Sequence, residues 1–174
     1  MTNWVDKQCA ETVYLTPEKI LEPVREYFGG AIPLDPATEK TNPTKALQFF
    51  TIEDDGLKQQ WNVPTFVNPP FGKAIREFMK KIHDEAIRDK ARPILALLPC
   101  GARFSTKYWQ NDALIPQLNA ICFVKGRVKF LRPDGTVAKQ NTYDSQIYGY
   151  NVDTNLFKFC FKHIGRILLT TVLL

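Results

Sequence analysis

The stretch Thr65–Gly72, which reads Thr-Phe-Val-Asn-Pro-Pro-Phe-Gly, constrains the fold of this 174-residue chain more than any other. It begins as a β-prone run and then meets two prolines, which fix φ at about −65° and remove two backbone donors. Pro70 also disfavours the helical region for Pro69. The stretch therefore predicts a strand that ends in a rigid elbow, where the carbonyl groups of Asn68 and Pro69 are little used by local turns.

The elbow also carries chemistry. Ligands of open α/β sheets bind at the carboxyl ends of the strands, and Phe71 adds a flat apolar face beside the acceptors of Asn68 and Pro69. Two acceptors and an aromatic ring suit an exocyclic amino group on a base. The alternative interpretation is a purely structural X-Pro-Pro-aromatic turn.

Composition predicts one globular domain over residues 1–174, since 44% of the residues are hydrophobic and 24% are charged. No run approaches the roughly 18 apolar residues of a membrane span, and the first residues do not resemble a signal peptide, so a cytoplasmic location is expected. The net charge of +5 permits an anionic partner. Because the four cysteines are widely spaced and only two histidines are present, no zinc site is expected. Core positions are expected for Cys100, Cys122 and Cys160.

Hydrophobic spacing predicts alternating helices and strands. One helix is expected to start with Thr16 as N-cap and Pro17 at the first position, and to end at Gly29-Gly30. The clearest helix spans 73–90 and is interpreted as a solvated amphipathic helix with His83 exposed. A helical stretch is also expected around 105–118. Strands are expected at 31–37, 47–50, 65–68, 93–99, 120–124 with a kinked continuation over 125–130, 146–150 and 156–161, before a final apolar element at 164–174.

This order predicts an α/β fold with a mainly parallel sheet, helices on both faces and antiparallel strands towards the C-terminal end. The segment Leu34–Ala37, which reads Leu-Asp-Pro-Ala, places a carboxylate after an early strand. There it can accept hydrogen bonds from a bound nucleoside. Taken alone, this segment and Asp54-Asp55-Gly56-Leu57 are common turn sequences. A further turn is expected at Pro133-Asp134-Gly135.

In chain order, these pieces resemble the pattern of the short phage-type DNA N6-adenine methyltransferases. That pattern comprises Thr-Pro, an Asp-x-Ala stretch, Asp-Gly-Leu before a Trp, and Asn-Pro-Pro-aromatic. The matching residues are Thr16-Pro17, Leu34–Ala37, Asp54–Leu57 with Trp61, and Asn68–Phe71. Lys125–Phe130 resembles the Gly-Arg-x-x-Phe stretch of the family, and a weaker resemblance covers Ser145–Tyr150.

The resemblance implies a Rossmann-like fold that uses S-adenosylmethionine (SAM) to methylate the N6 of adenine in DNA. The implied target-base residues are Asn68, Pro69, Pro70 and Phe71. The implied cofactor residues are Thr16, Pro17, Asp35, Pro36, Ala37 and Asp55, the last near the adenine of SAM. The glycine-rich loop of the wider methyltransferase pattern is missing from 34–39, and Glu53 is the candidate acid for the cofactor ribose.

Cations are expected to contact the DNA backbone. The candidates are Lys73, Arg76, Arg103, Lys107, Arg127 and Arg132. The length leaves no room for a separate recognition domain, so loops at 101–112 or 131–144 would read the sequence, or selectivity is low. No obligate protein partner is indicated. Cytosine N4 suits the same acceptors, RNA or a glutamine side chain are further substrates, and a catalytically idle nucleic-acid-binding module is the alternative from another class.

Overall fold

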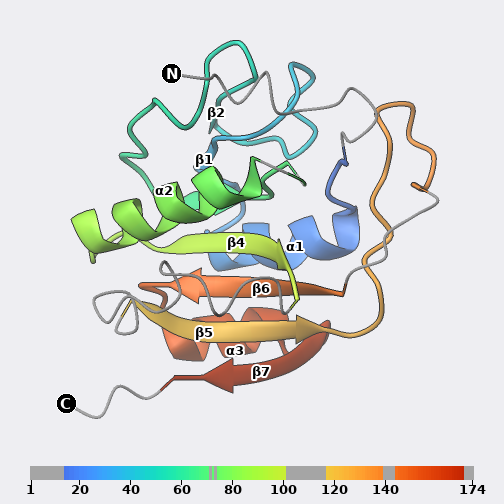
Figure 1. Ribbon diagram of the computed structural model, residues 1–174. Helices are drawn as coiled ribbons and strands as arrows, with labels where there is room; N and C mark the ends of the chain where they lie inside the picture. Colours follow the sequence, from blue (N-terminus) through green and yellow to red (C-terminus); the bar gives the residue numbers. More distant parts are fainter. Residues whose placement is uncertain (1–13, 71, 73, 101–116, 139–143, 171–174) are drawn as a thin grey trace.

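A computed structural model of the chain describes residues 14–70, 72, 74–100, 117–138 and 144–170 (Figure 1). In these ranges the chain forms one seven-stranded sheet and three helices. The strands are β1 (Leu34–Asp35), β2 (Gln48–Phe49), β3 (Thr65–Val67), β4 (Ile94–Pro99), β5 (Leu118–Val124), β6 (Ser145–Tyr150) and β7 (Gly165–Leu169). The helices are α1 (Glu18–Tyr27), α2 (Ile75–Arg88) and α3 (Thr154–Phe161). None of them combines the length and apolar character needed to cross a membrane.

The strand order is β2-β1-β3-β4-β6-β5-β7. Three pairings are parallel, namely β1 with β2, β1 with β3, and β3 with β4. The other three, β4 with β6, β5 with β6, and β5 with β7, are antiparallel. The α/β class and the antiparallel C-terminal strands are thus confirmed, but the sheet is mixed rather than mainly parallel. Parallel neighbours need a crossover, usually a helix, and residues 125–138, which follow β5, contain no helix.

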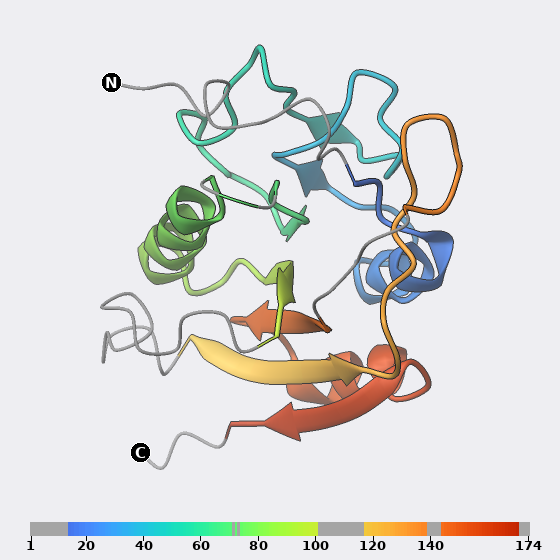
Figure 2. The same cartoon turned by 45° about the vertical axis from the view of Figure 1, so that its right-hand side comes forward.

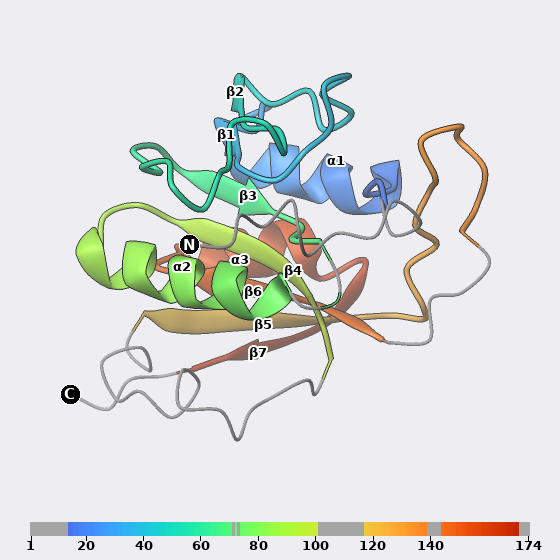
Figure 3. The same cartoon turned by 45° about the horizontal axis from the view of Figure 1, so that its top comes forward.

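The core lies in two clusters, and alternate residues of β4 divide between them. Leu95 and Leu97 belong to the cluster that includes the apolar residues of α1 and α3. Ile94, Ala96 and Leu98 belong to the cluster that includes those of α2. Because successive strand side chains point to opposite faces, the two clusters cover opposite faces of the sheet. Figure 2 separates α2 (green) from α1 (blue), and Figure 3 shows α2 in front of the sheet with α3 behind it.

The strand expected at 156–161 is wrong, because these residues belong to helix α3. The side chain of Asp153 caps this helix by accepting hydrogen bonds from the backbone N–H groups of Asn155 and Leu156. Its buried residues, Phe157, Cys160 and Phe161, follow helical spacing. The alternating aromatic residues suggested a strand, but packing of one helical face against the sheet determined the structure.

Three other local expectations differ from the structure. The N-cap of α1 is Pro17 rather than Thr16, and the Thr16 hydroxyl accepts a hydrogen bond from Asn68, as described below. Strand β5 ends at Val124 and does not continue over 125–130. Cys122 and Cys160 are buried as expected, whereas Cys100 is exposed just beyond the end of β4.

His83 was expected to be exposed, but it is 3% exposed on the inner face of α2. Its Nε2 atom lies 3.4 Å from the hydroxyl of Tyr150. Burial lowers the pKa of His83 from 6.5 to about 4, so the ring is neutral at pH 7. The charged residues next to His83 in the sequence suggested an exposed side chain. His83 nevertheless follows the helical spacing of the buried residues Met79, Ile82 and Ala86.

We expect His83 to make the protein less stable in acid. Since the folded-state pKa of His83 lies below its unfolded value, the unfolded chain binds more protons between these two values. Its contribution to stability is therefore complete above pH 6.5 and is lost as the pH falls through about 4. Urea titrations across this range should show a smaller pH dependence for His83→Gln than for wild type. Equal slopes for the two proteins would contradict the buried, neutral histidine.

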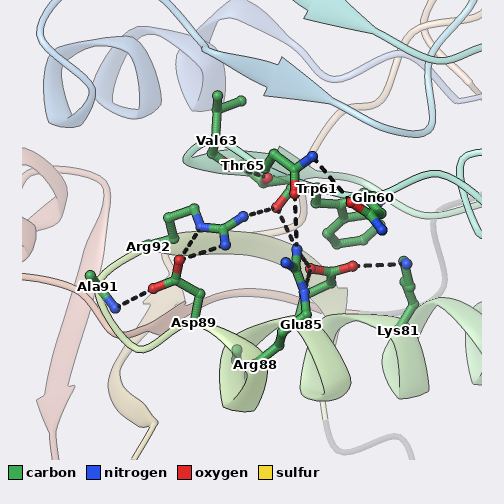
Figure 4. Close-up of polar contacts among 12 residues, drawn as sticks. Gln60, Trp61, Val63, Thr65, Lys81, Glu85, Arg88, Asp89, Ala91 and Arg92 are labelled. Carbon is green, nitrogen blue, oxygen red and sulfur yellow. Dashed lines mark hydrogen bonds and ion pairs between the residues drawn. The ribbon is translucent and has the colours of Figure 1, made fainter.

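A polar network fixes the chain between β2 and β3 to the end of α2 (Figure 4). The main-chain carbonyl of Trp61 accepts hydrogen bonds from Arg88, at 3.1 Å, and from Arg92. Buried Glu85 pairs with Arg88 and, at 2.8 Å, with Lys81. The Trp61 indole, itself buried, donates to the carbonyl of Gly56 at 2.9 Å. The network thereby positions the turn that contains Gly56.

Candidate active site

The strand order reverses between β1 and β3, because β2 flanks β1 on one side and β4 flanks β3 on the other. The two strands pair in parallel through Leu34 and Thr65, so their carboxyl ends lie at the same edge of the sheet. Asp35 ends β1, and Asn68 directly follows β3. Such a reversal is where open α/β sheets bind ligands. The tertiary structure thus brings two of the motifs found in the sequence to one place.

Asn68 has its two amide ends in different environments. Its Nδ2 group donates to the hydroxyl of Thr16 at 3.0 Å and to the carbonyl of Tyr14 at 3.3 Å. Its Oδ1 atom is buried and has no hydrogen-bond partner among the described residues. Leaving a buried acceptor unpaired costs about 1–3 kcal/mol, so this oxygen points to a donor supplied by a ligand. Pro69 is buried and Pro70 half-buried, and Phe71 lies outside the described residues.

Asp35 is 2% exposed, and its carboxylate is held by neighbouring protein groups. Its Oδ1 atom accepts from the backbone N–H of Ala37 at 3.1 Å, and its Oδ2 atom accepts from the hydroxyl of Thr44 at 2.8 Å. Burial raises the pKa of Asp35 to about 6, although these hydrogen bonds act in the opposite direction. The two hydrogen bonds of the Asp35 carboxylate therefore order the loop that follows β1. A ligand bound beyond the end of β1 would contact this loop rather than the carboxylate itself.

The turn at Asp54–Leu57 packs directly on the segment after β1. A Cβ atom on Gly56 would lie 1.9 Å from the carbonyl oxygen of Pro36, which explains why glycine occupies this position. Asp55 is buried and adopts a positive φ of 54°. Its Oδ2 atom pairs with Lys58 at 2.9 Å. Its Oδ1 atom is buried and finds no hydrogen-bond partner within the described part of the chain.

A cavity of about 380 Å³ opens beyond the carboxyl ends of β1 and β2. This volume lies within the range of small-molecule sites. Its lining residues are Leu15, Thr38, Glu39, Lys40, Thr41, Thr51, Ile52, Glu53 and Pro133. Leu15 connects the cavity with the elbow, because the next residue, Thr16, contacts Asn68.

Most of the residues that line this cavity were not singled out in the sequence. They follow strands of only two residues, which leave little periodic signal. Glu53, which was singled out for the cofactor ribose, pairs with Lys40 at 2.7 Å and accepts from the hydroxyl of Thr51 at 2.8 Å. The hydrogen bond from Lys40 lowers the pKa of Glu53 to about 2. Glu53 is therefore an ionised acceptor at the wall of the cavity.

A hairpin over residues 130–138 lies against the segment that holds Asn68. Leu15 and Leu131 exchange two backbone hydrogen bonds, of 2.7 and 3.0 Å. The expected turn at Pro133–Gly135 is confirmed by a 2.9 Å bond from the N–H of Gly135 to the carbonyl of Arg132. In Figure 1 this orange segment rises beside the dark-blue chain that precedes α1. The hairpin also contributes Pro133 to the cavity wall.

The candidate DNA-contacting cations come from separate elements. Arg76 is exposed on α2, and Arg127 and Arg132 are exposed on the segment that follows β5. Arg127 Nε lies 3.9 Å from a carboxylate oxygen of Asp144, and both side chains are largely exposed. Lys73, Arg103 and Lys107 lie outside the described residues, as does the whole loop expected at 101–112.

A family model described as DNA N-6-adenine-methyltransferase (Dam) matches residues 6–151. The matched range covers most of the 174 residues and runs from before α1 to the residue after β6. It includes the elbow, the cavity and the hairpin. No curated protein gave a significant match.

Proposed function

Because this chain belongs to the DNA N6-adenine methyltransferase family, we propose that its active site is the sheet edge formed by the carboxyl ends of β1 and β3. Family membership makes the protein an enzyme that methylates the N6 of adenine in DNA, and it implies the use of SAM. The observation that carries the placement of the site is the buried, unpaired Oδ1 atom of Asn68, as far as the described residues show. This atom provides the acceptor that an exocyclic amino group requires.

Asn68 and Pro69 prepare the amino group of the target adenine for attack. The lone pair of this nitrogen is conjugated with the base, which makes it a poor nucleophile. Acceptance of its two N–H bonds by Asn68 Oδ1 and the Pro69 carbonyl favours a more pyramidal, nucleophilic nitrogen. SAM, when bound, supplies a methyl group that its sulfonium centre already activates. The remaining work of the protein is to hold the amino group in line with that methyl group.

The target base must leave the duplex to reach this site, because its amino group is inaccessible within the stack. The prolines of the elbow restrict the backbone at Asn68 and Pro69, so the acceptors stay in place as the base arrives. Phe71 provides the ring on which the flipped base stacks, a contact worth roughly 1–3 kcal/mol per base.

The cavity between Leu15 and Glu53 supports the cofactor assignment, because it lies beside the elbow and is lined by acceptors. The carboxylate of Glu53, on the cavity wall, would accept hydrogen bonds from the ribose hydroxyls of SAM, and Asp55 would offer its buried Oδ1 atom. The family resemblance also implies Thr16, Pro17, Asp35, Pro36 and Ala37 as cofactor residues. Among these, Asp35 acts by ordering the loop that supplies Thr38 and Lys40 to the cavity wall. This location of the cofactor site is compatible with a Rossmann-like methyltransferase fold. The strand order reverses between β1 and β3, and the cavity lies at that edge of the sheet, beyond the carboxyl ends of β1 and β2.

The proposed DNA-backbone contacts are Lys73, Arg76, Arg103, Lys107, Arg127 and Arg132. Two observations support this set. Arg76 is exposed on α2, which begins shortly after the elbow. Arg132 is exposed at the base of a turn whose hairpin is paired with Leu15, next to the residue that contacts Asn68. The 131–138 part of the loop proposed to read the DNA sequence thus lies beside the active site.

Asp35→Asn is expected to weaken cofactor binding by about ten- to a hundredfold, the value of a lost hydrogen bond to a charged group. The amide of the variant has one acceptor oxygen instead of two, so it cannot accept from both Thr44 and Ala37, and the loop that lines the cavity loses one of its two anchoring hydrogen bonds. Calorimetric titration with S-adenosylhomocysteine measures this change, and DNA affinity is expected to change much less. An unaltered affinity for the cofactor product would show that the cofactor site lies elsewhere.

The reaction itself is tested by its product. We expect expression of the protein in a methylation-deficient bacterium to introduce N6-methyladenine into host DNA, as measured by nucleoside mass spectrometry. The Asn68→Ala variant, expressed to the same level, is the control. Finding N4-methylcytosine instead would move the target to the other amine. Finding neither modified base, with folded protein that binds the cofactor, would contradict the proposed function.

A further inference from the structure

The side-chain amide of Asn68 can face its site in two ways. Its nitrogen and oxygen ends have nearly the same shape, and one end only accepts hydrogen bonds while the other only donates. If Asn68 holds the target amino group, as proposed above, the oxygen must face that group. With the amide reversed, two donors would oppose each other and the contact would be lost. Contacts with the protein must therefore hold the Asn68 amide in one of its two orientations.

The hydrogen bonds of the Asn68 Nδ2 group determine the orientation of the amide. Its Nδ2 group lies 3.3 Å from the carbonyl oxygen of Tyr14 and 3.0 Å from the hydroxyl of Thr16. The Tyr14 carbonyl can only accept, so a reversed amide would place Oδ1 against another oxygen. We propose that Thr16 is a positioning residue which, together with the Tyr14 carbonyl, holds the Asn68 amide so that Oδ1 faces the target amino group. This inference rests on the proposed function of Asn68.

The two acceptors are themselves held in place. Leu15, between them, exchanges backbone hydrogen bonds with Leu131 of the 130–138 hairpin. The ring of Tyr14 packs 5.9 Å from that of Phe130, which is buried in the core. Thr16 is only 7% exposed. The hairpin thus fixes the main chain at 14–16, and this segment fixes the amide across a separation of more than 50 positions in the sequence.

This role differs from the contact with the cofactor that the family resemblance implies for Thr16, and the two roles have different kinetic effects. Loss of a cofactor contact weakens cofactor binding. Loss of a positioning contact leaves binding intact and lowers turnover, because the acceptor is needed in the correct orientation at the moment of transfer.

The test uses Thr16→Val, which keeps the shape of the side chain and removes the hydroxyl. Single-turnover methylation with saturating DNA and SAM should slow by about three- to tenfold, the range expected for one lost hydrogen bond. The dissociation constant for S-adenosylhomocysteine and the KM for DNA should stay within about twofold of wild type. Thr16→Ser restores the hydroxyl and should recover most of the rate.

Thr65→Val is the matched control. The Thr65 hydroxyl is also buried, lies on the strand that leads to Asn68, and donates to the carbonyl of Val63 at 2.9 Å. This variant should lose comparable stability without the loss of rate. A wild-type rate for Thr16→Val beside a slow Asn68→Ala would overturn the inference alone, and so would weaker cofactor binding at unchanged turnover. A wild-type rate for Asn68→Ala would instead overturn the proposed function.

Discussion

Replacing Asn68 by alanine is expected to lower the rate of adenine methylation by a factor of about 10²–10³, the usual effect of removing a preorganised polar contact to the reacting group. The change removes the buried Oδ1 acceptor, so one N–H bond of the target amine remains without a partner at the site. Cofactor affinity should change far less, since the contacts of Asn68 are to Tyr14 and Thr16. Single-turnover assays with saturating DNA and SAM measure the effect.

The Asn68→Asp variant tests the acceptor oxygen separately from the amide nitrogen. It retains an oxygen toward the target but places a second oxygen against the Tyr14 carbonyl, where Nδ2 now donates. We therefore expect measurable methylation at a rate between those of wild type and Asn68→Ala. A wild-type rate for Asn68→Ala would show that the elbow is only a turn.

Replacing Gly56 by alanine is expected to have the second largest effect. The new Cβ atom would lie 1.9 Å from the carbonyl oxygen of Pro36 and 3.0 Å from its carbonyl carbon. These are backbone atoms, so relief requires the two turns to separate. We expect a loss of about 1–3 kcal/mol in the free energy of unfolding, as for other overpacked positions. We also expect weaker cofactor binding, because Pro36 leads into the loop that lines the cavity.

Gly29→Ala provides a control of similar chemical size. Gly29 has a φ of 79° and open space around the position of a Cβ atom, so alanine there is strained without a collision. A left-handed residue costs roughly 1–2 kcal/mol, which makes the stabilities of the two variants comparable. Only Gly56→Ala should weaken S-adenosylhomocysteine binding in calorimetry. Equal cofactor affinities for the two variants would refute the contact between the turn and the cavity wall.

Several features of the site followed from local signals. The prolines at 69 and 70 predicted where β3 stops, and Gly29 and Gly30 predicted the end of α1. The turn at Pro133–Gly135 was also predicted correctly. Each of these features depends on the allowed backbone angles of one or two glycine or proline residues, which can be recognised directly in the sequence. By contrast, α3 was mistaken for a strand because its aromatic residues fit both periodicities.

The sequence by itself determined the elbow, its acceptors and the α/β class, since these depend on residue chemistry and short-range spacing. Only the tertiary structure decided that the sheet is mixed rather than mainly parallel, that His83 is buried and how the Asn68 amide is oriented. It also decided that Gly56 must pack on Pro36. These features arise from contacts between residues distant along the chain. Such contacts form when strands pair and helices cover the sheet, so no local pattern encodes them.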